Sequence, residues 1–161
     1  MDKNEKIERR YMKNKNIREL VDKAKITCDS FFQDEYVYSK DEAVEELGLD
    51  EELIEQLIED YVSQIIKSVM IFEEYLYELQ SDMDAKKPLD FTKLKDLAHR
   101  NLGVVKNLRI KDAEKLLDDL MKKDDLEYLF RCIEVLRACA IKMKPLYAFN
   151  TIKLIEIKST F

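Results

Sequence analysis

His99 is the residue of this chain best placed for chemistry, because the pattern around it predicts an exposed imidazole. It is the only histidine among 161 residues. At about 100° per residue, the apolar side chains of residues 90–108 fall in one stripe roughly 120° wide, with His99 on the opposite side. The stripe comprises Leu94, Leu97, Ala98, Val104, Val105 and Leu108. Lys95, Gly103 and Lys106 share the face of His99, and an exposed imidazole between two ammonium groups suits a phosphate.

These residue types can support nucleophilic chemistry on phosphorus without a separate base. An imidazole side chain is mostly neutral at cytoplasmic pH, so one ring nitrogen keeps a lone pair for in-line attack. Gly103 costs a helix roughly 1 kcal/mol relative to alanine, but its missing side chain clears space one turn from the imidazole. The close approach of a partner would explain that cost. The alternative is that Gly103 relieves helix packing or bends the helix, and that His99 is a surface residue without a role.

The composition predicts an all-α protein. Only two glycines and two prolines occur, and turn signals between β-rich runs are almost absent. With 46% hydrophobic and 39% charged residues, the chain can bury the core of a single domain. No apolar run approaches the roughly 18 residues of a membrane span, and the N-terminal sequence MDKNEKIERR lacks the apolar stretch of a secretory signal. A cytoplasmic location without membrane binding is therefore expected.

The sequence predicts neither a metal site nor a redox centre. Cys28, Cys132 and Cys139 have no Cys-x-x-Cys spacing, and a lone histidine cannot make up a histidine-rich zinc site. We expect reduced thiols, with Cys132 and Cys139 buried in a helix interface. The chain also lacks a glycine-rich phosphate loop and an evident metal-binding spacing of carboxylates, so we expect no cofactor of its own.

The net charge of −6 hides an uneven distribution. Lysine and arginine crowd residues 3–25, whereas residues 42–60 are strongly acidic. The simplest interpretation is two solvated faces that attract each other. A basic arm for nucleic acid is the less favoured alternative, because acidic residues dilute the basic segment.

Apolar spacing predicts a series of helices joined by short connections. They cover residues 4–27, 41–47, 51–83, 90–108, 112–122 and 126–144. Ser39 followed by Glu42 is typical of a capping box, and Gly48 is expected to end the short helix in a left-handed conformation. Asp50 and Asp90 are expected to cap the helices that follow them. Because short loops favour antiparallel neighbours, the expected architecture is an antiparallel up-down four-helix bundle.

The expected organisation has three parts. Residues 1–38 form a basic N-terminal helical extension with an aromatic linker, and residues 39–149 form the bundle. Residues 150–161 form a C-terminal tail that alternates loosely between apolar and polar side chains. Its conformation is left open, since one isolated strand is not a stable unit.

The segment AHRNLGVVKNLR, residues 98–109, resembles the phosphoacceptor helix of the histidine-containing phosphotransfer (HPt) domain, a four-helix module of bacterial phosphorelays. In that family, Ala-His is followed after one variable residue by Leu-Lys-Gly, and Asn-Leu-Gly begins eight residues past the histidine. The matching residues are His99 and Gly103 and, as structural members of the motif, Ala98, Asn107 and Leu108. The upstream LGLDEELIEQLIEDYV and downstream DAEKLLDDLMKKDDLEYLFRCIEVL also look like the family, so the resemblance covers roughly residues 41–149.

The resemblance implies an HPt-like bundle and a phosphorelay intermediate. His99 would accept a phosphoryl group from the aspartyl phosphate of a receiver domain and pass it to another receiver. The partner would be the receiver domain of a response regulator or of a hybrid histidine kinase, and it would supply Mg²⁺ and the electrostatics of the transition state. Lys95, Gly103 and Lys106 would contact the phosphate or the partner.

The segment departs from the family's pattern at three positions. Leu102 stands where the family has lysine, Asn101 where it has leucine, and Arg109 where it has the final glycine. Lys95 and Lys106 could replace the missing charge, although Lys106 lies about 10 Å along the helix from His99. Two alternatives therefore remain open: a degenerate HPt-like adaptor that binds a receiver or kinase without phosphotransfer, and an unrelated helical scaffold.

Overall fold

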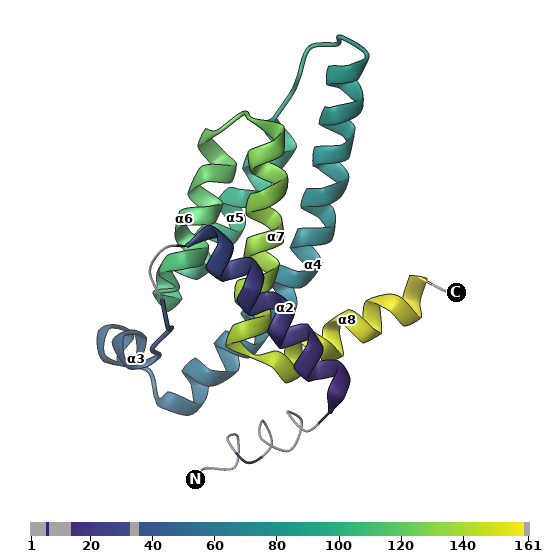
Figure 1. The fold of residues 1–161 in the computed structure, drawn as a ribbon. Coiled ribbons are helices and arrows are strands. Elements are labelled where there is room, and N and C mark those ends of the chain that lie inside the picture. The colour runs from purple at the N-terminus through teal and green to yellow at the C-terminus, as the bar shows by residue number, and fades with distance from the viewer. Residues whose placement is uncertain (1–5, 7–13, 33–35, 160–161) are drawn as a thin grey trace.

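All regular structure in the described part of the chain is helical, as the sequence predicts (Figure 1). The structure is a computed structural model, and it describes residues 6, 14–32 and 36–159. Seven helices follow one another in this part: α2 (Lys15–Phe31), α3 (Asp41–Leu47), α4 (Glu51–Asp84), α5 (Thr92–Leu108), α6 (Lys111–Lys122), α7 (Leu126–Met143) and α8 (Pro145–Ser159). No helix among these residues combines the length and apolar character needed to cross a bilayer.

The expected helix ends near α3 and α4 are confirmed with one exception. Gly48 ends α3 in the left-handed conformation, with φ of 66°, and the Asp50 side chain accepts a hydrogen bond from the backbone N–H of Leu53 at 2.8 Å. The prediction of a capping box at Ser39 is wrong. The N-cap of α3 is Lys40, which leaves Ser39 outside the cap and Glu42 one position too early to reach back to it.

The core lies between four helices that contact one another in sequence order. α4 packs against α5, α5 against α6, α6 against α7, and α7 returns to α4. One continuous cluster of buried side chains fills the space between them, including Ile65, Phe72, Leu94, Leu117 and Leu136. The amphipathic spacing of each helix supplies this cluster, because residues three and four apart lie on one face.

α2 and α8 extend the same core. Ile17, Val21, Ala24 and Cys28 on α2 are buried, and the helix packs on α7 and α8. The helix predicted at residues 4–27 is described only from Lys15 onward, since most of residues 1–13 lie outside the described residues. α2 continues beyond the predicted end at residue 27 and ends at Phe31.

Residues 150–159 of the C-terminal tail, for which the sequence predicts no definite conformation, belong to the helix α8. α8 begins with Pro145, a residue suited to a first helical position because its missing N–H is not needed there. It packs against α4, α7 and α2, and the Thr151 hydroxyl lies 2.9 Å from that of Ser63 on α4.

The linker between α2 and α3 holds the turn that follows the His99 helix. The Tyr38 hydroxyl donates to the carbonyl oxygen of Leu108 at 2.6 Å. The Tyr36 hydroxyl accepts from the backbone N–H of Lys111 at 3.1 Å and donates to the carbonyl oxygen of Arg109 at 3.3 Å. The aromatic linker therefore fixes the C-terminal end of α5 and the start of α6.

Two isoleucines on α2 test whether this helix belongs to the core. Ile17 is 0% exposed and Ile26 is 70% exposed. Replacing a buried isoleucine by alanine leaves a cavity, so Ile17→Ala should lower the free energy of unfolding by about 2–4 kcal/mol in urea titrations. The matched control Ile26→Ala should change it by less than about 0.5 kcal/mol. Equal effects of the two substitutions would show that α2 does not pack as described.

Candidate functional site

α5 presents His99 to solvent because its opposite side is buried. The buried side chains are Leu94, Leu97, Ala98, Asn101, Leu102, Val105 and Leu108. The side chains of His99, Lys95 and Lys106 are exposed, as is Gly103. Val104, expected in the buried stripe, is instead 44% exposed. The buried side is rotated toward Leu102, because α6 covers α5 there.

The surface around the imidazole is open. Among the described residues, none forms a hydrogen bond or an ion pair with His99. A Cβ atom built on Gly103 would meet no atom within 4 Å. The chain's own packing therefore does not require glycine at this position, which removes tight helix packing as the explanation for Gly103. The open space lies one helical turn from His99, on the same face.

A groove of about 400 Å³ runs between α5 and α6 beside this face. Leu102 and Lys106 line it from α5. Its α6 wall consists of Lys111, Glu114, Lys115 and Asp118. Lys111 and Lys115 are cations that the sequence analysis did not assign to the site. Their spacing of four residues indicates that they share one face of a helix. The sequence does not show which neighbouring helix this face meets, because that depends on tertiary packing.

Lys111 and Lys115 are each partnered by a carboxylate. The Lys111 ammonium lies 3.8 Å from Glu42 on α3, and that of Lys115 lies 3.2 Å from Asp119 on α6. Both lysine side chains remain more than half exposed. The Lys111–Glu42 pair is exposed on both sides and contributes little to stability, so the Lys111 ammonium can reorient toward an anion at modest cost, whereas Lys115 pairs with a buried carboxylate.

The remaining residues of the motif support the helix and its end. Ala98 and Leu108 are buried, whereas Asn107 is exposed. Arg109 takes the left-handed conformation, with φ of 61° and ψ of 38°, and forms the C-cap of α5. Its guanidinium group pairs with Glu46 on α3 and donates to the carbonyl oxygen of Lys106. The backbone geometry that favours glycine is thus held here by an arginine with partners.

Asn101, the second departure from the family's pattern, is a buried amide with hydrogen-bond partners. Its amide nitrogen donates to the carbonyl oxygen of Leu97 at 2.9 Å, and its oxygen accepts from the Ser68 hydroxyl on α4 at 3.4 Å. A buried serine opposite a buried asparagine satisfies both polar groups. Sequence reasoning missed this pair, because Ser68 and Asn101 become neighbours only when α4 and α5 pack.

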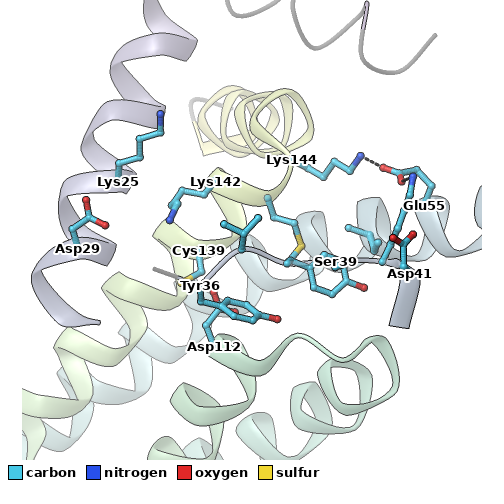
Figure 2. A pocket seen from close by; sticks show the side chains of 15 residues that line it. Lys25, Asp29, Tyr36, Ser39, Asp41, Glu55, Asp112, Cys139, Lys142 and Lys144 are labelled. Carbon is cyan, nitrogen blue, oxygen red and sulfur yellow. Dashed lines mark hydrogen bonds and ion pairs between the residues drawn. The ribbon is translucent and has the colours of Figure 1, made fainter. Parts of the chain in front are cut away.

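A second candidate region is a polar cavity of about 720 Å³ whose wall includes residues 36–40 of the α2–α3 linker (Figure 2). In Figure 2, Lys25 and Asp29 on α2 line one end, and the ion pair of Lys144 with Glu55 lies at the other. Glu55 is buried and also pairs with Lys40 at 3.0 Å. No local sequence pattern predicts this cavity, since α2, α4, α6, α7 and the linker all contribute to its wall.

Burial perturbs several titratable groups along this cavity. It raises the pKa of Tyr38 to about 12 and raises the pKa of Asp112 above its ordinary value of 3.8. A hydrogen bond from the backbone N–H of Ala113, at 2.7 Å, opposes the effect of burial on the pKa of Asp112. Asp112 is therefore a carboxyl group whose charged form is disfavoured by the fold.

Comparisons with known proteins identified no relative. No protein-family model matches the chain, and no curated protein or solved structure shows significant similarity to it. Among the described residues, no group of three or more histidine, cysteine, aspartate or glutamate side chains could hold a metal ion.

The raised pKa of Asp112 predicts a specific pH dependence of stability. The folded state binds this proton more tightly than the unfolded state, so the group lowers the free energy of unfolding as the pH rises above 3.8. Asp112→Asn removes that loss and keeps an oxygen for the N–H of Ala113. Relative to the unmodified protein, the variant should gain stability between pH 4 and pH 7 in urea titrations. The exposed Asp96→Asn serves as the control, and a difference independent of pH would contradict the assignment.

Proposed function

We propose that this protein is a phosphorelay intermediate in which His99 is the phosphoacceptor. The observation that carries the proposal is an exposed imidazole without a partner among the described residues, one turn from a glycine that the chain's own packing does not require. A glycine in a helix costs stability, and open space beside a nucleophile gives a reason for that cost. The partner is a receiver domain that must bring an aspartyl phosphate to the imidazole.

The packing of α4, α5, α6 and α7 supports an HPt-like, antiparallel up-down four-helix bundle as the scaffold. Each helix contacts the next, and α7 contacts α4. The connections from α5 to α6 and from α6 to α7 are short, which favours antiparallel neighbours. In such a bundle a helix with one buried side offers its other side to a partner, and in α5 that side holds His99.

The structural members of the motif occupy positions that fit the proposal. Ala98 is buried beside the exposed His99, and Leu108 is buried at the end of α5. At Arg109 the backbone adopts the left-handed conformation for which the related pattern uses glycine. The departures at Asn101 and Arg109 thus have local compensation, and the departure that matters for chemistry is Leu102.

The proposed step is an in-line transfer between two side chains. A neutral ring nitrogen of His99 attacks the phosphorus of the aspartyl phosphate, and a nitrogen–phosphorus bond forms as the bond to the aspartate oxygen breaks. The aspartate leaves as a carboxylate, and the proton on the other ring nitrogen remains or passes to solvent. Mg²⁺ bound by the receiver neutralises the phosphoryl oxygens. The reverse reaction delivers the group to a second receiver.

Cations on α5 and α6 supply part of the charge that a lysine at position 102 would have given. Lys95 and Lys106 flank His99 on α5, and Lys111 and Lys115 line the adjoining groove. An ammonium group near a phosphoryl oxygen stabilises the charge that spreads over it in the transition state. These four side chains favour phosphotransfer over an inert surface.

Leu102 is the observation that favours the second candidate, an adaptor that binds a receiver or kinase without phosphotransfer. Its side chain is 6% exposed and lines the groove between α5 and α6. An apolar, buried residue one turn from the imidazole cannot stabilise a phosphoryl group, whereas the exposed face of α5 remains open to a partner. Binding without transfer would be the signature of this adaptor.

Replacing His99 separates the two candidates. The purified protein and its His99→Gln variant should be incubated with phosphorylated receiver domains from the same genome, and transfer of the label followed. We expect an acid-labile, base-stable phosphate on the unmodified protein and none on His99→Gln. Because His99 is exposed, the variant should unfold at the same urea concentration. Receiver binding without any transfer to the unmodified protein would overturn the phosphotransfer proposal in favour of the adaptor.

A charge at position 102 should speed transfer if missing charge limits the rate. Leu102 lies at the edge of the groove, so a lysine there can extend its ammonium group to solvent, and Leu102→Lys should lower the free energy of unfolding by about 1–2 kcal/mol. We expect its rate of transfer to rise by about tenfold, equivalent to roughly 1.4 kcal/mol of barrier. Leu102→Gln is the neutral control of similar length. An equal rate for the two variants would show that charge is not the limiting factor.

A further inference from the structure

Two cysteines far apart in the sequence meet where α2 crosses α7. The Sγ atoms of Cys28 on α2 and Cys139 on α7 lie 3.6 Å apart. Both side chains are buried, at 4% and 7% exposure. Cys132, the third cysteine, is also buried on α7, but no contact with another sulfur is formed by it among the described residues. Proximity therefore distinguishes one pair of thiols from the third.

The polar cavity gives this pair a path to solvent. Cys139 lines its wall, and so do Lys25 and Asp29, which lie one turn before and one residue after Cys28 on α2 (Figure 2). Asp112 and Lys142 contribute to the same wall. A cavity of about 720 Å³ admits molecules much larger than water, so a small polar oxidant can reach Cys139, whose sulfur lies 3.6 Å from that of Cys28, without unfolding of the helices.

We propose that Cys28 and Cys139 form an oxidation site, a thiol pair that a hydroperoxide converts into a disulfide between α2 and α7. The required movement is small, because the two sulfur atoms must approach by only about 1.5 Å from their present separation to reach bonding distance. This site is independent of His99 and of the proposed phosphotransfer.

The surroundings of the pair favour a thiolate shared between the two sulfur atoms. The hydrogen bond with Cys139 lowers the pKa of the Cys28 thiol, against the opposing effect of burial, and the positive charge of Lys142 lowers it further. The hydrogen bond to Cys28, burial and the carboxyl of Asp112 raise the pKa of the Cys139 thiol. One thiolate held beside one thiol is the form of the pair that can react with a hydroperoxide.

The reaction balances with one hydroperoxide per pair. The thiolate of one cysteine of the pair attacks one oxygen of hydrogen peroxide, the oxygen–oxygen bond breaks, and water leaves after protonation, which gives a sulfenic acid. The sulfur of the other cysteine then displaces the hydroxyl group, the sulfur–sulfur bond forms, and a second water leaves. The two sulfur atoms lose two electrons, and the peroxide gains them.

The bond would close a loop that contains α3, α4, α5 and α6. Residues 28 and 139 are 111 positions apart, and a cross-link over so long a loop restricts the unfolded chain strongly. It would also hold the end of α2, from which the linker runs to Tyr36 and Tyr38 on the α5–α6 turn. Oxidation should therefore raise the urea concentration at which the protein unfolds.

The test counts free thiols in the full-length protein. The protein is treated with hydrogen peroxide at neutral pH, unfolded in guanidinium chloride, alkylated with N-ethylmaleimide and weighed by mass spectrometry. The untreated chain should take up three alkyl groups, one per cysteine, and the oxidised chain one, with a mass loss of 2 Da before alkylation. The peptide map should join Cys28 to Cys139.

Single replacements provide the controls. Cys132→Ser leaves the proposed pair intact, so its oxidised form should take up no alkyl group. Cys28→Ser and Cys139→Ser should form no intramolecular disulfide and should retain two reactive thiols. Folding of each variant is checked by far-ultraviolet circular dichroism, and Cys132→Ser keeps the test valid if the other two do not fold. Three alkylated thiols after oxidation, stable sulfinic acids, or a disulfide that includes Cys132 would overturn the proposal.

Discussion

The burial of one side of α5 is the constraint on which the rest of the candidate site depends. Ala98 and Val105 are fully buried, so helical geometry directs His99, at about 100° from Ala98, away from the core. α4 and α6 hold this orientation from two sides. The linker and α3 hold the end of the helix, through the Tyr38 hydroxyl on Leu108 and the ion pair of Arg109 with Glu46. Helix packing thereby directs His99 to solvent, although its side chain has no hydrogen bond or ion pair with any other described residue.

The helices were predictable because their signals are local. Apolar spacing and caps gave the bounds of α4 to within one residue, and gave the ends at Gly48 and Leu108. The prediction at Ser39 is wrong because the spacing from Ser39 to Glu42 fits a capping box, whereas the N-cap of α3 is the next residue, Lys40. α8 could not be predicted, since its sequence has weak helical periodicity and gains its order from contacts with α4 and α7.

Features of the candidate site that lie on one helix could be predicted from the sequence, whereas contacts between helices could not. The exposure of His99 and Gly103 follows from the α5 pattern alone. Val104 was predicted to be buried and is exposed, because the sequence of α5 does not show which of its sides α6 covers. For the same reason, the pairing of Ser68 with Asn101 and the approach of Lys115 to the His99 face emerge only from tertiary packing. Such arrangements depend on which helices are neighbours, and residue spacing does not specify this.

The N-terminal helix connects the two regions of interest. α2 buries its apolar side on α7, and the linker that follows it contacts the α5–α6 turn. The polar cavity lies between these contacts and reaches Asp112 in the first turn of α6, the helix that also lines the groove beside His99.

Direct phosphorylation by a small molecule tests the central claim without a partner. Phosphoramidate should be incubated with the protein, and the product analysed by intact mass and peptide mapping. We expect one adduct of about 80 Da, lost in acid and kept in base, on the peptide that contains His99, because the imidazole is open and flanked by ammonium groups. No adduct, or an adduct on lysine alone, would contradict the claim that this imidazole is a phosphoacceptor.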